Sequence, residues 1–403
     1  MKVVEINSYD FGSTGNIMIN IAKVSERFGI DVYTFSSSRQ SIGTDYRKHR
    51  YMDSVVDYRV HMVMGMFFGY ELEFSYLATK RLVKELKKIS PDIIHLHNTH
   101  GWFLNHKILF DYVNKNNIKL LWTLHDCWSF TGRCPYFQIT GCDQWKKCCG
   151  KCVYDRKRYP ASYWVDRSEK NYKKKKKLFT SIKQLTLVTP SQWLADLVKQ
   201  SFLKDYNVQV INNGIDLSVF RPTESDFRKN YGLEDKYIIL GVAAFWGKRK
   251  GFDVFWELAK RLDDKYRIVL VGVNEEQSCE LPAHIIGIKQ TSNKTELSQI
   301  YTEADVFANP TREDNFPTVN IESLACGTPV VTFNTGGSPE IIDETCGSVT
   351  DCDDIDAFEK EIRRICEDKP YSQEDCLKRA KKFDMNDKFE EYVRLYDVQD
   401  ESV

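Results

Sequence analysis

Two carboxylates placed on either side of a predicted helix start are the most chemically suggestive feature of the sequence. Asp314 lies in an acidic loop, and Glu322 lies eight residues later, inside a predicted helix over residues 318–326. The first backbone N–H groups of a helix lack intrahelical partners and favour an anion. Two carboxylates can accept hydrogen bonds from the hydroxyls of one polyol, and the amides favour a phosphate. Together these groups indicate a site for a sugar joined to a phosphate.

The elements around these residues are typical of an open parallel sheet. A strand is predicted over residues 330–333, and a Gly-rich loop that ends at Glu340 follows it. A second loop, FWGKRKG at 245–251, follows a buried strand predicted over 236–244. Open parallel sheets present their ligand-binding groups at the carboxyl ends of the strands, and a basic, Gly-flanked loop there suits a pyrophosphate.

This stretch resembles the donor-binding region of the retaining glycosyltransferases of the GT-B fold, family 4 (group 1), of the bacterial surface-polysaccharide type. Members carry two acidic residues separated by seven others, with Phe-Pro or Phe-Gly after the first and a Glu-Ala/Ser-x-Ala-x-Gly-x-Pro-Val run at the second. This chain supplies Asp314, Phe316-Pro317 and the run ESLACGTPV that begins at Glu322. The first acid is usually Glu, and Glu313 stands beside Asp314, so either residue could fill that role.

The resemblance extends from residue 1 to about residue 396 and implies two doubly wound Rossmann-like domains facing across a cleft. Strands that alternate with helices twice along the chain predict the same α/β class. We expect an N-terminal acceptor domain at 1–218 and a C-terminal nucleotide-sugar domain at 219–381. The last helix, 382–403, is expected to pack back on the first domain.

The resemblance also implies roles for single residues. Glu322 would hydrogen-bond the nucleotide ribose, Asp314 or Glu313 the donor sugar, and Lys250 the diphosphate. The family's Arg five residues before that Lys is replaced by Phe245, and Arg249 is the candidate substitute. The candidate donor-binding residues, the three candidate catalytic residues aside, are Gly12, Gly15, Arg249, Lys250, Glu313, Asn315, Phe316, Pro317, Thr318, Val319 and Asn320.

His125, at the end of a strand predicted over 120–124, is the third candidate catalytic residue with Asp314 and Glu322. In the family a His at this place contacts the transferred sugar or the acceptor, and a capping pair with Asp126 is the plainer alternative. The glycines at 12 and 15 lie in a predicted Gly-rich turn over 11–16 that does not match G-x-G-x-x-G. A plain strand-to-helix turn is the alternative there.

A polar insertion at 127–155 holds half of the twelve cysteines. Cys134, Cys142, Cys149 and Cys152 have the spacing C-x7-C-x6-C-x2-C, which favours a structural zinc over free thiols. Cys148 could replace Cys149, and iron–sulfur ligation is the other alternative. His95 and His97, two apart on a predicted strand, point the same way, but with no third ligand near in sequence they are interpreted as cleft lining or hydrogen-bonding groups.

The remaining composition limits partners and location. The formal net charge is zero, which argues against a nucleic-acid partner. No signal peptide is recognised and no apolar run reaches the roughly 20 residues that span a bilayer. We expect a cytoplasmic protein, with the basic run at 170–183 as a candidate for docking on the anionic inner face of the plasma membrane, and a solvated helix face as the alternative.

The sequence therefore predicts a retaining glycosyltransferase that uses a nucleotide-diphosphate sugar, of the UDP or GDP type, and a glycan or polyprenyl-linked acceptor. No catalytic metal is expected, because no Asp-x-Asp motif stands at a suitable strand end; Asp351 and Asp353 are interpreted as surface loop. The alternatives are a nucleotide-sugar 2-epimerase of the same fold and a non-catalytic binding protein that uses the cysteine-rich module.

Overall fold

The computed structural model describes residues 1–37, 43–52 and 55–397, and the chain in it forms two compact units. The first unit comprises Met1–Asn212 and the residues from Lys388 on, and the second comprises Asn213–Asp387. The boundary lies earlier than the expected residue 218, because Ile215 already pairs with Asp384 in a β-bridge of the second unit. Residues 398–403 of the expected last helix lie outside the described residues.

The first unit is built on a seven-stranded parallel sheet with the order β3-β2-β1-β4-β5-β6-β7. Its strands are β1 Lys2–Ile6, β2 Asp31–Ser36, β3 His49–Tyr51, β4 Ile93–Leu96, β5 Lys119–Thr123, β6 Leu185–Thr189 and β7 Asn207–Val210. Its helices are α1 Gly12–Arg27, α2 Val55–Phe68, α3 Tyr76–Ile89, α4 His106–Lys115, α5 Ser168–Phe179 and α6 Gln192–Lys199. The last helix, α14 Met385–Asp397, belongs to this unit from Lys388 on.

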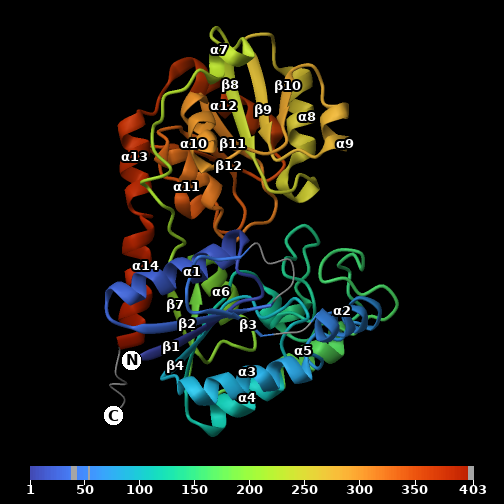
Figure 1. Ribbon diagram of the computed structural model, residues 1–403. Coiled ribbons are helices and arrows are strands. Elements are labelled where there is room, and N and C mark those ends of the chain that lie inside the picture. Colours follow the sequence, from blue (N-terminus) through green and yellow to red (C-terminus); the bar gives the residue numbers. More distant parts are fainter. Residues whose placement is uncertain (38–42, 53–54, 398–403) are drawn as a thin grey trace. The chain divides into compact units, whose positions relative to one another are not determined.

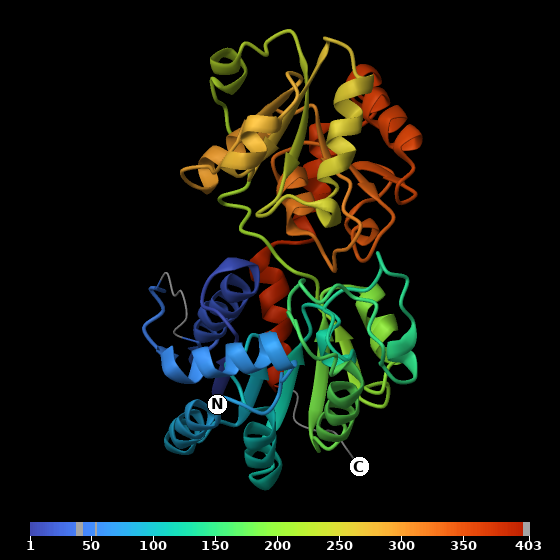
Figure 2. The same ribbon diagram turned by 90° about the vertical axis from the view of Figure 1, so that its right-hand side faces the viewer.

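The second unit has a six-stranded parallel sheet with the order β10-β9-β8-β11-β12-β13. Its strands are β8 Tyr237–Val242, β9 Tyr266–Val271, β10 Ile285–Ile288, β11 Val306–Asn309, β12 Val330–Phe333 and β13 Gly347–Thr350. Its helices are α7 Phe227–Tyr231, α8 Phe252–Arg261, α9 Glu275–Glu280, α10 Lys294–Glu303, α11 Thr318–Ala325, α12 Ile355–Asp368 and α13 Gln373–Lys381. In each unit, helices cover both faces of the sheet (Figures 1 and 2).

Both sheets contain a point where the strand order reverses direction. In the first unit this switch point lies between β1 and β4, and in the second it lies between β8 and β11. Ligands of open α/β sheets bind outside the carboxyl ends of the strands at such points. The loops after β8 and β11, which contain the predicted basic loop and Asp314, therefore lie where this fold binds ligands.

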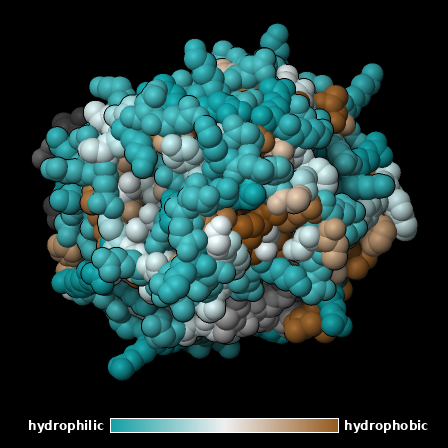
Figure 3. Space-filling model, turned by 90° about the horizontal axis from the view of Figure 1, so that it is seen from above, coloured by the Kyte–Doolittle hydropathy of each residue, from teal (hydrophilic) through white to brown (hydrophobic). Residues whose placement is uncertain are grey.

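The strands read as buried apolar runs because both faces of each sheet are covered. Every residue of β4 and β11 is buried, including His95. The helices α4 and α6 begin after Asn105 and Ser191, whose side chains accept hydrogen bonds from the first turn. The face shown in Figure 3 is mainly hydrophilic with small separate apolar areas, as expected for a chain of which 28% is charged. None of the helices in the described part of the chain has the length and apolar character needed to cross a bilayer.

Two local predictions were wrong. The expected Gly-rich turn at 11–16 is mostly helix, because α1 begins at Gly12 after an extended Phe11. The tail that was expected to be helical from Glu374 to Tyr396 is interrupted between α13 and α14, where residues 383 and 385 form backbone hydrogen bonds with Ile215.

Candidate active site

An ion pair joins the two loops at the switch point of the second unit. Lys250 ends a 3-10 turn, Lys248–Lys250, after β8, and its ammonium contacts the carboxylate of Asp314, which lies in the loop after β11. Both side chains are partly accessible, at 19% and 15% of their surface. The two charges that the sequence assigned to donor phosphate and donor sugar thus lie in direct contact.

Arg249 braces the same two loops through the backbone. Its Nη1 donates to the carbonyl of Glu313 at 2.9 Å, and its own carbonyl accepts from the N–H of Arg312 at 2.8 Å. Glu313 is only 2% exposed, whereas Asp314 is accessible. Of the two candidate acids, Asp314 is therefore the one that the geometry leaves open to a ligand.

Glu322 lies half-buried on α11. The hydroxyl of Tyr301 donates to its Oε2 at 3.2 Å. Burial raises the pKa of Glu322 above its ordinary value, and hydrogen bonds from Tyr301 and Thr318 oppose that shift. The Tyr301 contact fixes the carboxyl group in place without enclosing it.

The N-terminus of α11 is less free than expected. Pro317, at the cap position, provides no side-chain hydrogen bond to the helix, but its carbonyl accepts from the N–H of Asn320 at 3.1 Å. The prediction that this N–H lacks a partner was therefore wrong, because the helix starts with a tight 3-10 turn. Thr318 and Val319 occupy the first two helical positions, where N–H groups point out of the helix end.

The remaining predicted donor-binding residues of this unit are structural supports. Asn320 is buried, accepting from Asn309 Nδ2 at 2.7 Å and donating to Ser338 Oγ at 3.0 Å. Asn315 and Phe316 are each 4% exposed. The ring of Phe316 packs on Phe383, with centroids 5.7 Å apart. These contacts help to hold the loops that carry Lys250 and Asp314.

Gly251 is required by the close packing of these loops. It has a φ of +72°, and a Cβ built on it would lie 2.3 Å from the carbonyl oxygen of Pro310. We expect Gly251→Ala to lower the free energy of unfolding by more than the roughly 1–2 kcal/mol that the positive φ alone costs. Gly247→Ala is the matched control, because Gly247 is extended and its Cβ would meet nothing within 4 Å. Equal chemical-denaturation midpoints for the two variants would contradict this packing.

His125, in the first unit, ends a buried chain of hydrogen bonds. Its Nε2 lies 3.1 Å from Nδ1 of His97, whose Nε2 lies 3.2 Å from the carboxylate of Glu5. Tyr396 of α14 donates to the other carboxylate oxygen of Glu5 at 3.3 Å and lies 2.7 Å from Nδ1 of His95. The carboxyl end of β5 is thereby linked to the last helix of the chain.

Burial favours the neutral form of each titratable group in this hydrogen-bond network. Burial raises the pKa of Glu5 well above its ordinary value and lowers those of His95 and His97 well below theirs. Burial likewise lowers the pKa of His125 to about 4. His125 therefore presents a neutral imidazole whose orientation is set by His97.

Glu5 is the residue that the sequence reasoning missed. Within the described ranges, Glu5, His95 and His97 are the one group whose metal-capable atoms all lie within 4.8 Å of one another. Their buried atoms are already engaged in hydrogen bonds to one another and to Thr123 and Tyr396, so we interpret the group as a polar network. The sequence signal that could have pointed to Glu5 is a carboxylate within the apolar strand β1.

Asp126 lies close enough to His125 for its charge to raise the pKa of that imidazole, and it also bonds two further groups. Its Oδ2 lies 2.8 Å from Nε2 of His100, and its Oδ1 accepts from the N–H of Trp128 at 2.8 Å. Burial opposes ionisation, but His100 and the Trp128 N–H hold the pKa of Asp126 below its ordinary value. Asp126 therefore anchors the loop that follows β5.

The two predicted glycines lie at the start of α1 in the first unit. Gly12 is exposed with a φ of +70°. Gly15 is buried, and a Cβ there would lie 2.6 Å from the backbone of Asp10. The structure thus places Gly12, Gly15 and His125 in one unit and the other donor-binding candidates in the other.

The four predicted metal-ligating cysteines gather in the first unit. Cys134 and Cys149 are buried, and Cys142 and Cys152 are half-buried against the same apolar core. Burial, and then the neighbouring thiols of Cys152, Cys149 and Cys142, raise the pKa of Cys134. The thiols therefore lie within electrostatic range of one another, although no three sulfur atoms meet the 4.8 Å spacing given above.

The lysine-rich segment forms α5, and its apolar residues face inward. Tyr172 and Phe179 are buried in the core, as is Ile182 just after the helix. Lys175 is also buried, 3.1 Å from Glu71. The helix therefore uses its aromatic and aliphatic groups for packing, and docking on an anionic membrane surface would fall to its exposed lysines.

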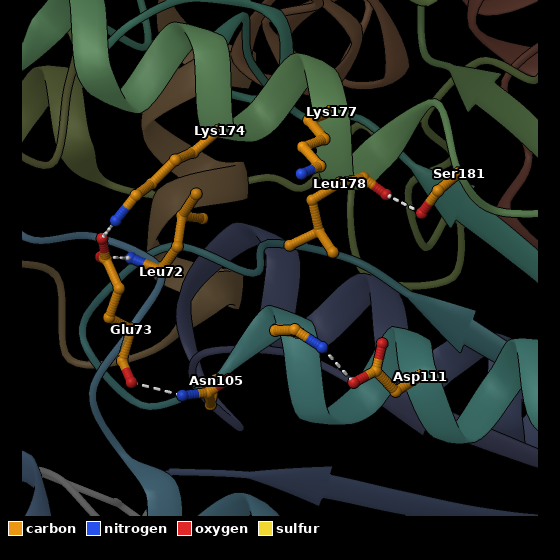
Figure 4. Close-up of a pocket in the computed structure, with 9 residues that line it drawn as sticks. Leu72, Glu73, Asn105, Asp111, Lys174, Lys177, Leu178 and Ser181 are labelled. Carbon is orange, nitrogen blue, oxygen red and sulfur yellow. Dashed lines mark hydrogen bonds and ion pairs between the residues drawn. The ribbon is translucent and has the colours of Figure 1, made fainter.

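A cavity of about 560 Å³ lies beside α4 and α5 (Figure 4). It is lined by Leu72, Glu73, Asn105, Lys107, Asp111, Lys174, Lys177, Leu178 and Ser181. Lys174 pairs with Glu73, and Lys107 pairs with Asp111. The cavity is therefore less basic than its lysines suggest.

Comparison with known protein families decides which family this fold and site represent. The family model described as Glycosyltransferase Family 4 matches residues 14–219, and the model described as Glycosyl transferases group 1 matches residues 223–383. The chain belongs to glycosyltransferase family 4. The expectation of a glycosyltransferase is confirmed at the level of the family, and the GT-B fold is confirmed by solved structures.

The family 4 relatives are distant in sequence. WcaC of Escherichia coli, named as a colanic acid biosynthesis glycosyl transferase, is 26% identical over 66% of this chain and 65% of its own length. The N,N'-diacetylbacillosaminyl-diphospho-undecaprenol alpha-1,3-N-acetylgalactosaminyltransferase of Campylobacter jejuni is 28% identical over 50% of this chain. That match spans 57% of the Campylobacter protein, so the similarity covers under two thirds of either relative.

Solved structures share the fold over nearly the whole chain. A sucrose-phosphate synthase of Thermosynechococcus elongatus has a TM-score of 0.70 at 16% identity, with 98% of both chains covered. Anabaena HepE, solved in complex with UDP-glucose, has a TM-score of 0.67 at 14% identity, with 98% of this chain and 100% of that chain covered. At this identity the likeness shows the GT-B fold.

Proposed function

We propose that this chain is a retaining glycosyltransferase that moves a sugar from a nucleotide-diphosphate sugar to a hydroxyl of a glycan or polyprenyl-linked acceptor. The observation that carries the proposal is the contact of Lys250 with Asp314 at the switch point of the second unit. Glu322 lies on the helix that follows the same loop. A nucleotide-diphosphate sugar requires a cation for its diphosphate and hydrogen-bond acceptors for the hydroxyls of its sugar and ribose. Lys250 is that cation, and Asp314 and Glu322 are those acceptors.

Each group has a distinct role in this proposal. Glu322 accepts hydrogen bonds from the ribose hydroxyls, and Asp314 accepts from a hydroxyl of the transferred sugar. The ammonium group of Lys250 contacts the diphosphate as well as Asp314, and it stabilises the negative charge that develops on the diphosphate as the bond to the sugar breaks. The N–H groups of Thr318 and Val319 add positive potential from the helix end.

No protein nucleophile and no catalytic metal enter this scheme. The acceptor hydroxyl attacks from the face that the diphosphate leaves, and the departing phosphate oxygen takes up the acceptor proton. Lys250 and the start of α11 supply the positive charge that a divalent cation provides in other phosphate sites. His125 contributes a neutral hydrogen-bonding imidazole to the acceptor or the transferred sugar.

Bacterial surface-polysaccharide assembly is the setting that we propose. The printed name of the Escherichia coli relative refers to colanic acid biosynthesis, and that of the Campylobacter relative refers to a diphospho-undecaprenol acceptor. HepE, solved with UDP-glucose, supports a nucleotide sugar as donor. We propose a cytoplasmic location at the inner face of the plasma membrane, where exposed Lys176 and Lys177 on α5 favour anionic lipid.

Transfer assays with product analysis test the proposal. The purified chain is incubated in EDTA with UDP- and GDP-sugars and a polyprenyl-diphosphate-linked sugar, and the anomeric configuration of the product is read by NMR. We expect a product that keeps the configuration of the donor. An inverted product, a dependence on divalent metal, or an epimerised nucleotide sugar formed without acceptor would contradict it, and the last outcome would identify an epimerase.

A further inference from the structure

The cysteine-rich segment at 127–155 has little regular structure but takes part in the first-unit core. It contains two 3-10 turns, Trp128–Phe130 and Gln144–Lys146. Trp145 is buried between Phe130 and Phe137, with ring centroids 5.3 and 5.1 Å away. A segment of this kind needs cross-links to hold its loops, because few backbone hydrogen bonds do so.

The four cysteines come from separate turns of this segment and approach one apolar cluster. Cys134 and Cys149 belong to the cluster, and Cys142 and Cys152 pack against it. The side chain of Asp166 accepts from the N–H of Cys152 at 2.8 Å, which fixes the closing turn. The thiols of Cys142, Cys149 and Cys152 all act electrostatically on Cys134, so the fold brings near one another thiols that are up to 18 positions apart in the sequence.

The geometry separates Cys149 from its neighbour Cys148. The N–H of Gly132 donates to Sγ of Cys149 at 3.1 Å, a contact that stabilises a thiolate. Gly132 has no room for a side chain, because its Cβ would lie 2.8 Å from Cβ of Cys149. Cys148 is exposed, and its Sγ contacts the carbonyl of Cys149. These contacts favour Cys149 over Cys148 as the ligand.

We propose that Cys134, Cys142, Cys149 and Cys152 bind one zinc ion in a closed, tetrahedral structural site. Four sulfur ligands with a C-x2-C closing pair are typical of structural zinc, and a full set of protein ligands leaves no position for substrate. Zinc–sulfur bonds of about 2.3 Å require the thiols to draw closer than they now lie. The proposal therefore requires the half-buried side chains of Cys142 and Cys152 to turn toward Cys134 and Cys149 when the metal binds.

The zinc site would stabilise the loop after β5, which carries His125 and Asp126. The segment follows β5 directly, so that His125 and Asp126 lie at its start. Lys175 of α5 donates to the carbonyl of Trp128 at 2.9 Å and lies near Cys134 and Cys149. A zinc ion bound to these cysteines would therefore hold in place the loop that carries His125 and Asp126. This structural role does not depend on the proposed glycosyltransferase activity.

Metal content measures the proposal directly. The full chain is purified reduced and without a metal-affinity step, and its metals are measured by mass spectrometry; we expect about one zinc per chain. Cobalt added to the chelator-stripped protein should give the charge-transfer and d–d absorption of a tetrahedral thiolate site. Cys148→Ser is the matched control and should keep the metal, whereas Cys142→Ser should lose at least about nine tenths of it.

Several outcomes would overturn the zinc site. A reduced wild type that binds neither zinc nor cobalt would do so even if every cysteine variant failed to fold. Iron with inorganic sulfide in place of zinc, or full metal content in Cys142→Ser, would do the same. A loss of zinc with unchanged nucleotide binding would leave the proposed function standing, so the two proposals fail separately.

Discussion

Replacement of Glu322 by glutamine is expected to weaken donor binding roughly 100-fold while the protein stays folded. Hydrogen bonds to a charged acceptor contribute about 1.5–3 kcal/mol each, and the proposed ribose contact uses two. Glutamine keeps the volume and still accepts from Tyr301, which now donates to the carboxylate at 3.2 Å. The dissociation constant of the nucleoside diphosphate, measured by calorimetry, gives the size of the effect.

Glu344→Gln is the matched control for this substitution. Glu344 is an exposed glutamate of the same unit, outside the switch-point loops, and its replacement should leave the affinity unchanged. Thermal melting without ligand shows whether each variant is folded. A Glu322→Gln variant that binds as tightly as the wild type would remove Glu322 from the site.

The same carboxyl group predicts a pH dependence. Burial raises the pKa of Glu322 above its ordinary value. Only the ionised form accepts from two hydroxyls, so the affinity should fall as the pH falls through this raised pKa. Without ligand the sign reverses: a carboxyl with a raised folded-state pKa stabilises the fold more at acidic pH than above it. Between pH 5 and 8, the wild type should therefore bind the nucleoside diphosphate more weakly at lower pH, as measured by calorimetry, while its melting temperature without ligand gains from the protonated carboxyl group. Glu322→Gln should lack both of these pH dependences.

Replacement of Lys250 by methionine is expected to lower kcat roughly 100- to 1000-fold. The ammonium group would stabilise charge that develops on the leaving diphosphate, and removal of one such group typically costs about this factor. Because that contact strengthens in the transition state, kcat should fall more than the KM for the donor rises. Lys248→Met, in the same turn but exposed, is the control and should transfer at the wild-type rate.

A double substitution separates this role from the ion pair itself. Lys250 contacts Asp314, so its loss also leaves that carboxylate without its cation. If Lys250 served only to neutralise Asp314, Lys250→Met combined with Asp314→Asn would recover activity. We expect the double variant to remain as slow as the slower single variant, because the diphosphate still lacks its cation.

The α/β class could be predicted because strand and helix patterns alternate along the whole chain. The strand at 330–333 has the predicted bounds, since it is a short β-branched run between clear turn signals. Sequence reasoning also placed Lys250 and Asp314 in loops that follow strands, where open parallel sheets bind their ligands. Their direct contact was not predictable, because it depends on how two loops far apart in sequence pack.

The errors come from residues whose partners are remote in sequence. Asn320 seemed to be a ligand-binding amide, yet its N–H bonds Pro317 and its side chain bonds Asn309 and Ser338. The lysine run at 170–183 gave no sign that Lys175 within it is buried, because its partner Glu71 lies far away in sequence. Glu5 was overlooked because its histidine partner, His97, comes 92 positions later and a buried carboxylate leaves no local pattern.

Thermal melting with UDP, GDP, ADP and TDP, each with and without EDTA, tests the central claim most directly. The claim is that the second unit binds a nucleoside diphosphate through Lys250 and Glu322 without a divalent metal. It predicts that one of the four raises the melting temperature equally in EDTA and in magnesium, and that the shift disappears in Glu322→Gln. A shift that requires magnesium, or no shift from any of the four, would contradict it.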